Sequence, residues 1–145
     1  ARVDLQRFDL DESLLRHIFG LAKELKIDAT KIHDTDALGP ASPEWHRLRQ
    51  LVEMAEQRAL GELQAQTAPL LLVQPGLLAR FGLTTLLTAL IEASRKGAPP
   101  RFLLLPTAEG AGVPKINGEL PLPQVSPSEL LHVPPAWLKQ HQPAA

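Results

Sequence analysis

The sequence predicts a mixed α/β fold, a small and partly parallel sheet flanked by helices with an N-terminal helical pair. Two uninterrupted apolar runs, residues 70–73 and 101–105, are each bounded by proline, which is typical of buried strands. Residues 84–96 between them have helical apolar spacing. Strand, helix and strand in this order form a βαβ unit. We therefore expect residues 69–106 to contain two parallel strands joined by a right-handed crossover.

The N-terminal helical pair is expected at residues 11–26 and 43–66. Apolar residues recur at three- and four-residue steps in both segments, and Asp9 or Asp11 can cap the first helix. Ser42 followed by proline is a strong start signal for the second. The polar residues 27–39 between them are expected to form a loop with no more than one helical turn.

The remaining segments are expected to be short, because most of the 14 prolines follow residue 98. They are a short helix at 77–81, a tight hairpin at 116–119, an extended edge segment at 120–123, a short helix starting at the 126–129 capping box, and a last helical turn at 134–138.

Composition limits the classes of function. A length of 145 residues suits one α/β domain, residues 1–145, which we expect to be the C-terminal module of a longer protein. Without cysteine, the chain has no disulfides and no thiolate metal sites, which fits a cytoplasmic location. A net charge of −1 gives no long-range attraction to nucleic acid or to anionic membranes, so neither is expected as a partner.

No motif for catalysis or cofactor binding is found. The glycine-rich residues 110–115 lack the spacing of a phosphate-binding loop, and no serine lies in a nucleophile elbow. The cluster at residues 33–36, His-Asp-Thr-Asp, would need ligands from elsewhere to hold a metal ion. We therefore expect no catalytic residue, no metal and no cofactor.

One mainly apolar segment with two polar residues, residues 74–82, follows the first predicted strand. It lies at the carboxyl end of that strand, where open α/β sheets bind ligands. Gln74 and Arg80 are its candidate binding residues, and Arg80 suits an anion or a partner carboxylate. The structural alternative is that Arg80 binds carbonyl groups at a helix end or an acidic residue such as Glu109.

Several segments together resemble a known family. They are the His-Asp-Thr-Asp cluster, the run from Leu70 through Pro-Gly-Leu-Leu-Ala-Arg to Gly82, the run at 102–108, Ile-Asn-Gly at 116–118 and Ala-Trp-Leu at 136–138. This order is similar to the C-terminal region of the large serine/threonine kinases of BREX-type phage-defence systems, the PglW-like proteins, from about residue 8 to 141.

The resemblance implies an accessory domain attached to a kinase. The kinase glycine-rich loop, strand lysine, His-Arg-Asp loop and Asp-Phe-Gly motif are missing from the sequence, so no catalytic residue is carried over. The implied partners are other domains of the parent protein or neighbouring defence-system proteins.

Two functions follow as hypotheses. The first is a non-catalytic interaction or regulatory module that docks partners through an exposed apolar patch, for which the proline-rich segment around Trp137 is the candidate. The second is a ligand-sensing domain that binds a nucleotide or another anion at the edge formed by residues 74–80. It requires a concave pocket there and an Arg80 that is not paired internally.

Overall fold

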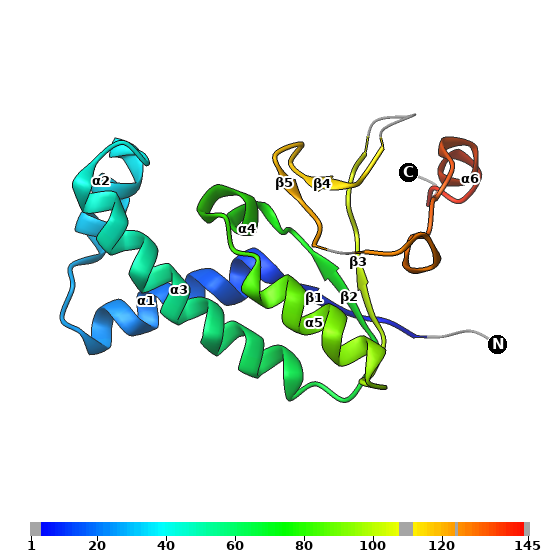
Figure 1. Cartoon of the computed structure of the whole chain (residues 1–145), viewed down its shortest axis with the longest axis horizontal. Coiled ribbons are helices and arrows are strands. Elements are labelled where there is room, and N and C mark those ends of the chain that lie inside the picture. Colours follow the sequence, from blue (N-terminus) through cyan, green and yellow to red (C-terminus); the bar gives the residue numbers. More distant parts are fainter. Residues whose placement is uncertain (1–3, 108–111, 124, 144–145) are drawn as a thin grey trace.

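The chain is built around a three-stranded parallel sheet with the strand order β1-β2-β3 (Figure 1). The computed structural model describes residues 4–107, 112–123 and 125–143. The strands are β1 (Gln6–Asp9), β2 (Leu70–Val73) and β3 (Arg101–Leu103), and the central β2 pairs with both neighbours in parallel. The mixed α/β class and the parallel βαβ unit are confirmed.

Two helical connections join the strands. The connection from β1 to β2 contains α1 (Leu10–Glu24), α2 (Ala29–Leu38) and α3 (Pro43–Gln64). The connection from β2 to β3 contains α4 (Gly76–Phe81) and α5 (Thr85–Arg95). The predicted N-terminal helical pair corresponds to α1 and α3. Asp9 caps α1 and Ser42 caps α3, as their positions in the sequence suggested.

The expectation of a loop at residues 27–39 is wrong, because ten of these residues form α2. The side chain of Asp28 accepts a hydrogen bond from the backbone N–H of Thr30 at 2.8 Å and caps this helix. Ile32 is its one buried residue. A surface helix with a single anchor has no apolar stripe, so periodicity could not reveal it.

The first strand, β1, was not predicted. Among the described strands it is an edge strand, and it pairs with β2 in the register Gln6 to Leu70 and Phe8 to Leu72. Its first two residues are exposed, and Phe8 is its one large apolar residue. A four-residue polar strand gives neither an apolar run nor a clear alternation.

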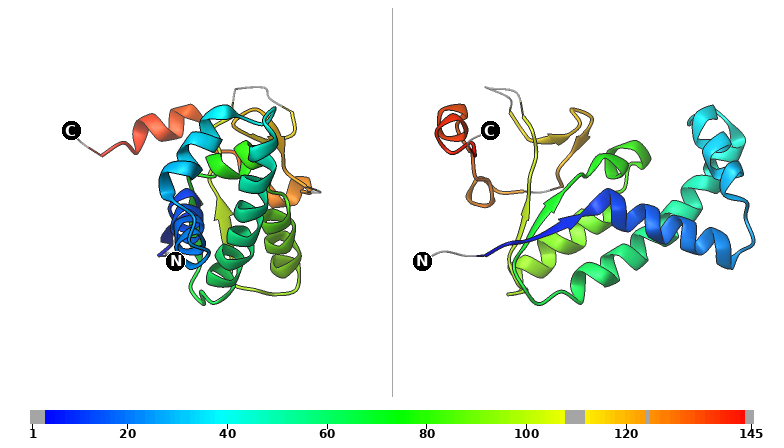
Figure 2. Two further views of the ribbon diagram at one scale, coloured as in Figure 1. Left: turned by 90° about the vertical axis from the view of Figure 1, so that its left-hand side faces the viewer. Right: turned by 180° about the vertical axis from the view of Figure 1, so that it is seen from behind.

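The helices cover one face of the sheet. Leu70 and Leu72 point into the core, whereas Arg7, Leu71 and Phe102 lie in register across the other face. The expectation of a buried strand holds for the central β2, where Leu71 is half-buried and Val73 is 8% exposed, but not for the edge strand β3, where Phe102 is 39% exposed. Two right-handed crossovers between strands in consecutive order place their helices on the same side. Figure 2 shows, on the right, the sheet from the side opposite α5.

The core fills the space between this covered face and the helices. Large fully buried side chains come from α1, α3, the central strand β2 and the α4–α5 region: Leu10, Leu14, Leu21, Leu63, Leu70, Leu72, Leu78, Leu83 and Leu86. Among the described residues, no helix combines the length and the apolar character needed to cross a membrane.

A hairpin and a C-terminal segment follow the sheet. The strands β4 (Lys115–Ile116) and β5 (Leu120–Pro121) pair in antiparallel around Asn117 and Gly118, which both have positive φ, so the predicted hairpin is confirmed. A 3₁₀ turn, η1 (Pro127–Glu129), and the short helix α6 (Pro135–Gln140) lie where the sequence predicted two short helical segments near the C-terminus.

Two arginine–glutamate pairs link α1 to α3. Arg16 donates two hydrogen bonds, both 2.9 Å long, to Glu62, which also accepts one from the buried Ser13. Arg58 donates two bonds of 2.8 Å to Glu24. The side chain of Glu62 is 26% exposed and that of Glu24 is 58% exposed. The Arg16 guanidinium is the main reason why the pKa of Glu62 falls to about 2.

The lowered pKa of Glu62 predicts that the fold loses stability in acid. Because the pKa of Glu62 in the folded state lies below its ordinary value of 4.5, its stabilisation is present above pH 4.5 and is lost as the pH falls towards 2. We expect a loss on the order of 1–2 kcal/mol after allowance for solvent screening. Chemical unfolding at pH 2.5–6 measures it. Glu62→Gln should flatten this dependence.

Glu24→Gln is the matched control, since Glu24 pairs with an arginine across the same two helices but is more exposed. It should leave most of the acid dependence in place. Equal flattening by the two variants would contradict the assignment to Glu62.

Candidate functional site

The carboxyl ends of β1 and β2 meet at a junction where two helices cap each other. The backbone N–H of Asp11 donates to the carbonyl of Gln74 at 3.0 Å. In return, the Asp11 side chain accepts a hydrogen bond from the backbone N–H of Leu77 at 2.8 Å. The starts of α1 and α4 are therefore satisfied by each other's segments.

The chain turns sharply at this junction. Gln74 has a φ of 55°, in the left-handed region that side chains rarely occupy. A Cβ atom added at Gly76 would lie 3.2 Å from Asp11 Oδ2, so glycine allows the close approach of α4 to the carboxylate. Gln74 thus contributes its backbone to the fold, which the sequence-based binding hypothesis did not foresee.

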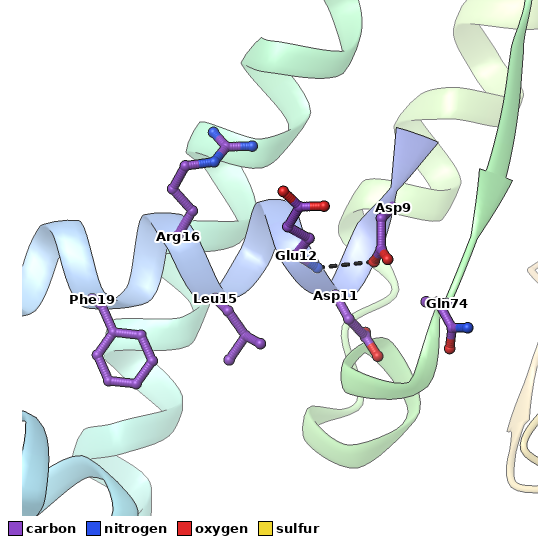
Figure 3. A pocket seen from close by; sticks show the side chains of 7 residues that line it. All are labelled: Asp9, Asp11, Glu12, Leu15, Arg16, Phe19 and Gln74. Carbon is purple, nitrogen blue, oxygen red and sulfur yellow. Dashed lines mark hydrogen bonds between the residues drawn. The ribbon is translucent and has the colours of Figure 1, made fainter. Parts of the chain in front are cut away.

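A shallow pocket of about 620 Å³ opens beside the junction (Figure 3). Its lining residues come from the end of β1, from α1 as far as Phe19 and from the residue after β2: Asp9, Asp11, Glu12, Leu15, Arg16, Phe19 and Gln74. Figure 3 shows Leu15 and Phe19 projecting from the same side of α1, with Arg16 pointing the opposite way. We call this the acidic pocket.

The electrostatics of the acidic pocket oppose an anionic ligand. Three carboxylates line it, and Arg16, its one cationic lining residue, is held by Glu62. Burial, followed by repulsion from Asp9, raises the pKa of Asp11, while the Leu77 N–H opposes this shift. A negatively charged ligand placed in the pocket would be repelled by these carboxylates. The pocket therefore suits a cationic or apolar group.

Arg80 does not line the acidic pocket. Its Nε donates to Asp36 Oδ1 at 2.8 Å and its Nη2 to the Asp36 carbonyl at 3.0 Å, near the end of α2. The structural alternative expected Arg80 to bind an acidic residue or carbonyl groups at a helix end. Asp36 provides both kinds of acceptor. Glu109, the partner suggested from the sequence, lies outside the described residues.

The other predicted candidates lie apart from each other. His33 packs against Phe19 with ring centroids 5.5 Å apart, and its neighbour Asp36 is used by Arg80. Within residues 4–107, 112–123 and 125–143, no group of three or more histidine or carboxylate side chains is arranged to hold a metal ion.

Trp137 lies in a segment that contributes nothing to the core. We call residues 126–143 the C-terminal arm. Every residue from 127 to 143 is exposed, and Leu131 reaches 79%. Its large exposed apolar side chains are Leu130, Leu131, Val133, Trp137 and Leu138. The left-hand view of Figure 2 shows α6 projecting away from the body.

The base of the arm is fixed to the body. Arg95, at the end of α5, donates to Glu129 Oε1 at 2.7 Å. Arg95 and the Ser126 hydroxyl lower the pKa of Glu129 to about 2, so this bond stays charge-assisted at neutral pH. The rings of Trp137 in α6 and His141, the C-cap residue of this helix, stack with centroids 4.1 Å apart.

The fold and this geometry define a two-layer α/β domain with an acidic pocket and an exposed apolar arm. No family model matches the chain, and neither the curated proteins nor the solved structures contain a match.

Sequence reasoning missed the acidic pocket because it missed β1. Asp9 and Asp11 were interpreted as helix caps, and both do accept capping hydrogen bonds. Placing a strand that ends at Asp9 would have moved both to the ligand-binding edge of the sheet.

Proposed function

We propose that this chain is a non-catalytic interaction and regulatory module of a BREX-like bacterial phage-defence protein kinase, working in the cytoplasm. The observation that supports an interaction role is the C-terminal arm, whose large apolar side chains have no place in the core. Contiguous exposed apolar surface on a small domain is typical of a protein interaction site. The link to phage defence depends on the sequence resemblance alone.

The arm has the composition of a docking element. Tryptophan is among the residues that most often dominate binding energy, and Trp137 is half exposed. Pro134 and Pro135 precede it and restrict the backbone, which lowers the entropy lost on binding. The proposed partners are the other domains of the parent kinase or neighbouring defence-system proteins.

The alternative function, sensing of a nucleotide or another anion at residues 74–80, receives less support. Arg80 is engaged by Asp36, and the nearby pocket carries three carboxylates. A nucleotide at a hundred times its dissociation constant would stabilise the fold by about 2.7 kcal/mol. A panel of nucleotides in a thermal unfolding assay is expected to give no such increase.

The interaction function is tested with purified partners. The remaining part of the kinase and each neighbouring defence protein are titrated against the chain by calorimetry. We expect one of them to bind, and Trp137→Ala to weaken that binding by roughly 30-fold or more.

Met54→Ala is the matched control, because Met54 is also half exposed but lies on α3, away from the arm. It should bind like the wild type. If none of the partners binds, or if Trp137→Ala binds normally, the proposal is overturned.

A further inference from the structure

The side of the sheet away from the helices is an apolar surface that the described part of the chain covers only in part, since Val73 on this side is buried whereas Phe102 is 39% exposed. Leu71 and Phe102 lie in register across it, and Leu104, next to the end of β3, is 55% exposed. Parallel sheets are nearly always covered on both sides. We call this surface, with Arg7 and Asp9 on β1, the open face.

The open face continues into the acidic pocket. Asp9 alternates with Phe8 along β1 and lies on the same side as Arg7, and it also lines the pocket. In the pocket, Leu15 and Phe19 provide apolar surface beside the carboxylates. A matching binder would carry apolar side chains next to a positive charge.

The C-terminal arm has this composition. Trp137 and Leu138 are followed directly by Lys139, and residues 130–143 contain two histidines but no aspartate or glutamate. The arm is therefore complementary in charge to the acidic pocket and matches the open face in apolar character. Opposite charges at an interface favour the matching orientation over others.

The arm does not reach the acidic pocket of its own chain. Figure 1 and the right-hand view of Figure 2 both show α6 standing away from α1. The Arg95–Glu129 ion pair fixes the base of the arm to the end of α5. In the left-hand view of Figure 2, α6 projects beyond the sheet on the side opposite α5, which is the side of the open face. A second molecule on that side would meet both surfaces.

We infer that two copies of this chain pair reciprocally, the arm of each lying on the open face and acidic pocket of the other. One two-fold arrangement then covers both apolar surfaces at once. Lys139 of one copy meets the carboxylates of Asp9 and Glu12 of the other. A net charge of −1 opposes this pairing very little. The inference rests on the proposed interaction role of the arm and names its partner as a second copy.

Sedimentation equilibrium over a concentration series tests the pairing. We expect the wild-type chain to form a dimer, and Trp137→Ala to raise its dissociation constant by roughly 30-fold. Leu38→Ala, at an exposed apolar residue on α2, should leave the dissociation constant unchanged.

A charge exchange tests the orientation. Lys139→Glu and Glu12→Lys should each weaken the dimer by roughly 3- to 10-fold, and the double variant should recover most of the loss. A monomer at all concentrations would overturn the inference. So would a dimer that is insensitive to Trp137→Ala, or one that the double charge variant fails to recover.

A failure of the pairing inference can be distinguished from a failure of the proposed function. A monomeric chain that binds a defence protein through Trp137 would overturn the pairing alone. A dimer sensitive to Trp137→Ala, without binding to any kinase domain or defence protein, would support the pairing and overturn the proposed function.

Discussion

Leu72→Ala is expected to lower the free energy of unfolding by about 2–5 kcal/mol. Leu72 is 2% exposed on the central strand and packs in the core between the sheet and the helices. The truncation removes buried methyl groups and leaves a cavity that close-packed neighbours fill only in part. Urea unfolding followed by circular dichroism measures the loss as a lower midpoint with an unchanged slope.

Leu71→Ala is the matched control, because Leu71 is the adjacent residue of the same strand and points to the open face. It is partly exposed, so its truncation should cost less than about 2 kcal/mol. Both variants are measured at concentrations where the chain is monomeric, since pairing would bury Leu71. If both variants lost the same free energy of unfolding in the monomer, the two faces of the sheet would be equally buried, which would contradict the one-sided arrangement of the helices.

Glu56→Ala is expected to destabilise the fold by about 1–3 kcal/mol. Glu56 on α3 is 3% exposed, and its Oε1 accepts a hydrogen bond of 2.7 Å from the backbone N–H of Leu86. Thr84, the N-cap residue of α5, makes no side-chain capping hydrogen bond, so Glu56 caps this helix from a distant segment. Alanine leaves the buried Leu86 N–H without its acceptor.

Glu56→Gln keeps the acceptor and should stay within about 1 kcal/mol of the wild type at pH 7. Burial raises the pKa of Glu56 above its ordinary value of 4.5, so the folded state favours the protonated form. The stability that this proton binding adds is present below pH 4.5 and is lost as the pH rises through the raised pKa.

Unfolding measured from pH 4 to pH 8 separates the two effects of Glu56. The wild type should lose stability across the window above pH 4.5, and Glu56→Gln should lack that contribution. If glutamine proves as damaging as alanine, the hydrogen bond to Leu86 is not the main contribution of this side chain.

The parts of the fold that could be predicted are those with dense local signals. The strand at residues 70–73 is an apolar run between prolines, and α3 begins with Ser42 and Pro43. By contrast, β1 and α2 each contribute little to the core, chiefly the partly buried Phe8 and the buried Ile32. Tertiary contacts, not local pattern, fix these two elements.

The candidate site was predicted less well for the same reason. Arg80 was singled out because it is polar in an apolar segment, but its partner Asp36 belongs to the helix that was missed. The acidic pocket depends on β1, which the sequence pattern does not indicate. Trp137 could be placed in the exposed arm because prolines there exclude long helices.

The position of β1 in the sheet also bears on how the chain folds. About twice as many residues separate Gln6 from its partner Leu70 as separate Leu70 from Arg101. Closing the longer loop costs about 0.6 kcal/mol more in chain entropy. The β2–β3 unit therefore has the lower cost of assembly, which favours its forming first as a template onto which the N-terminal strand docks late.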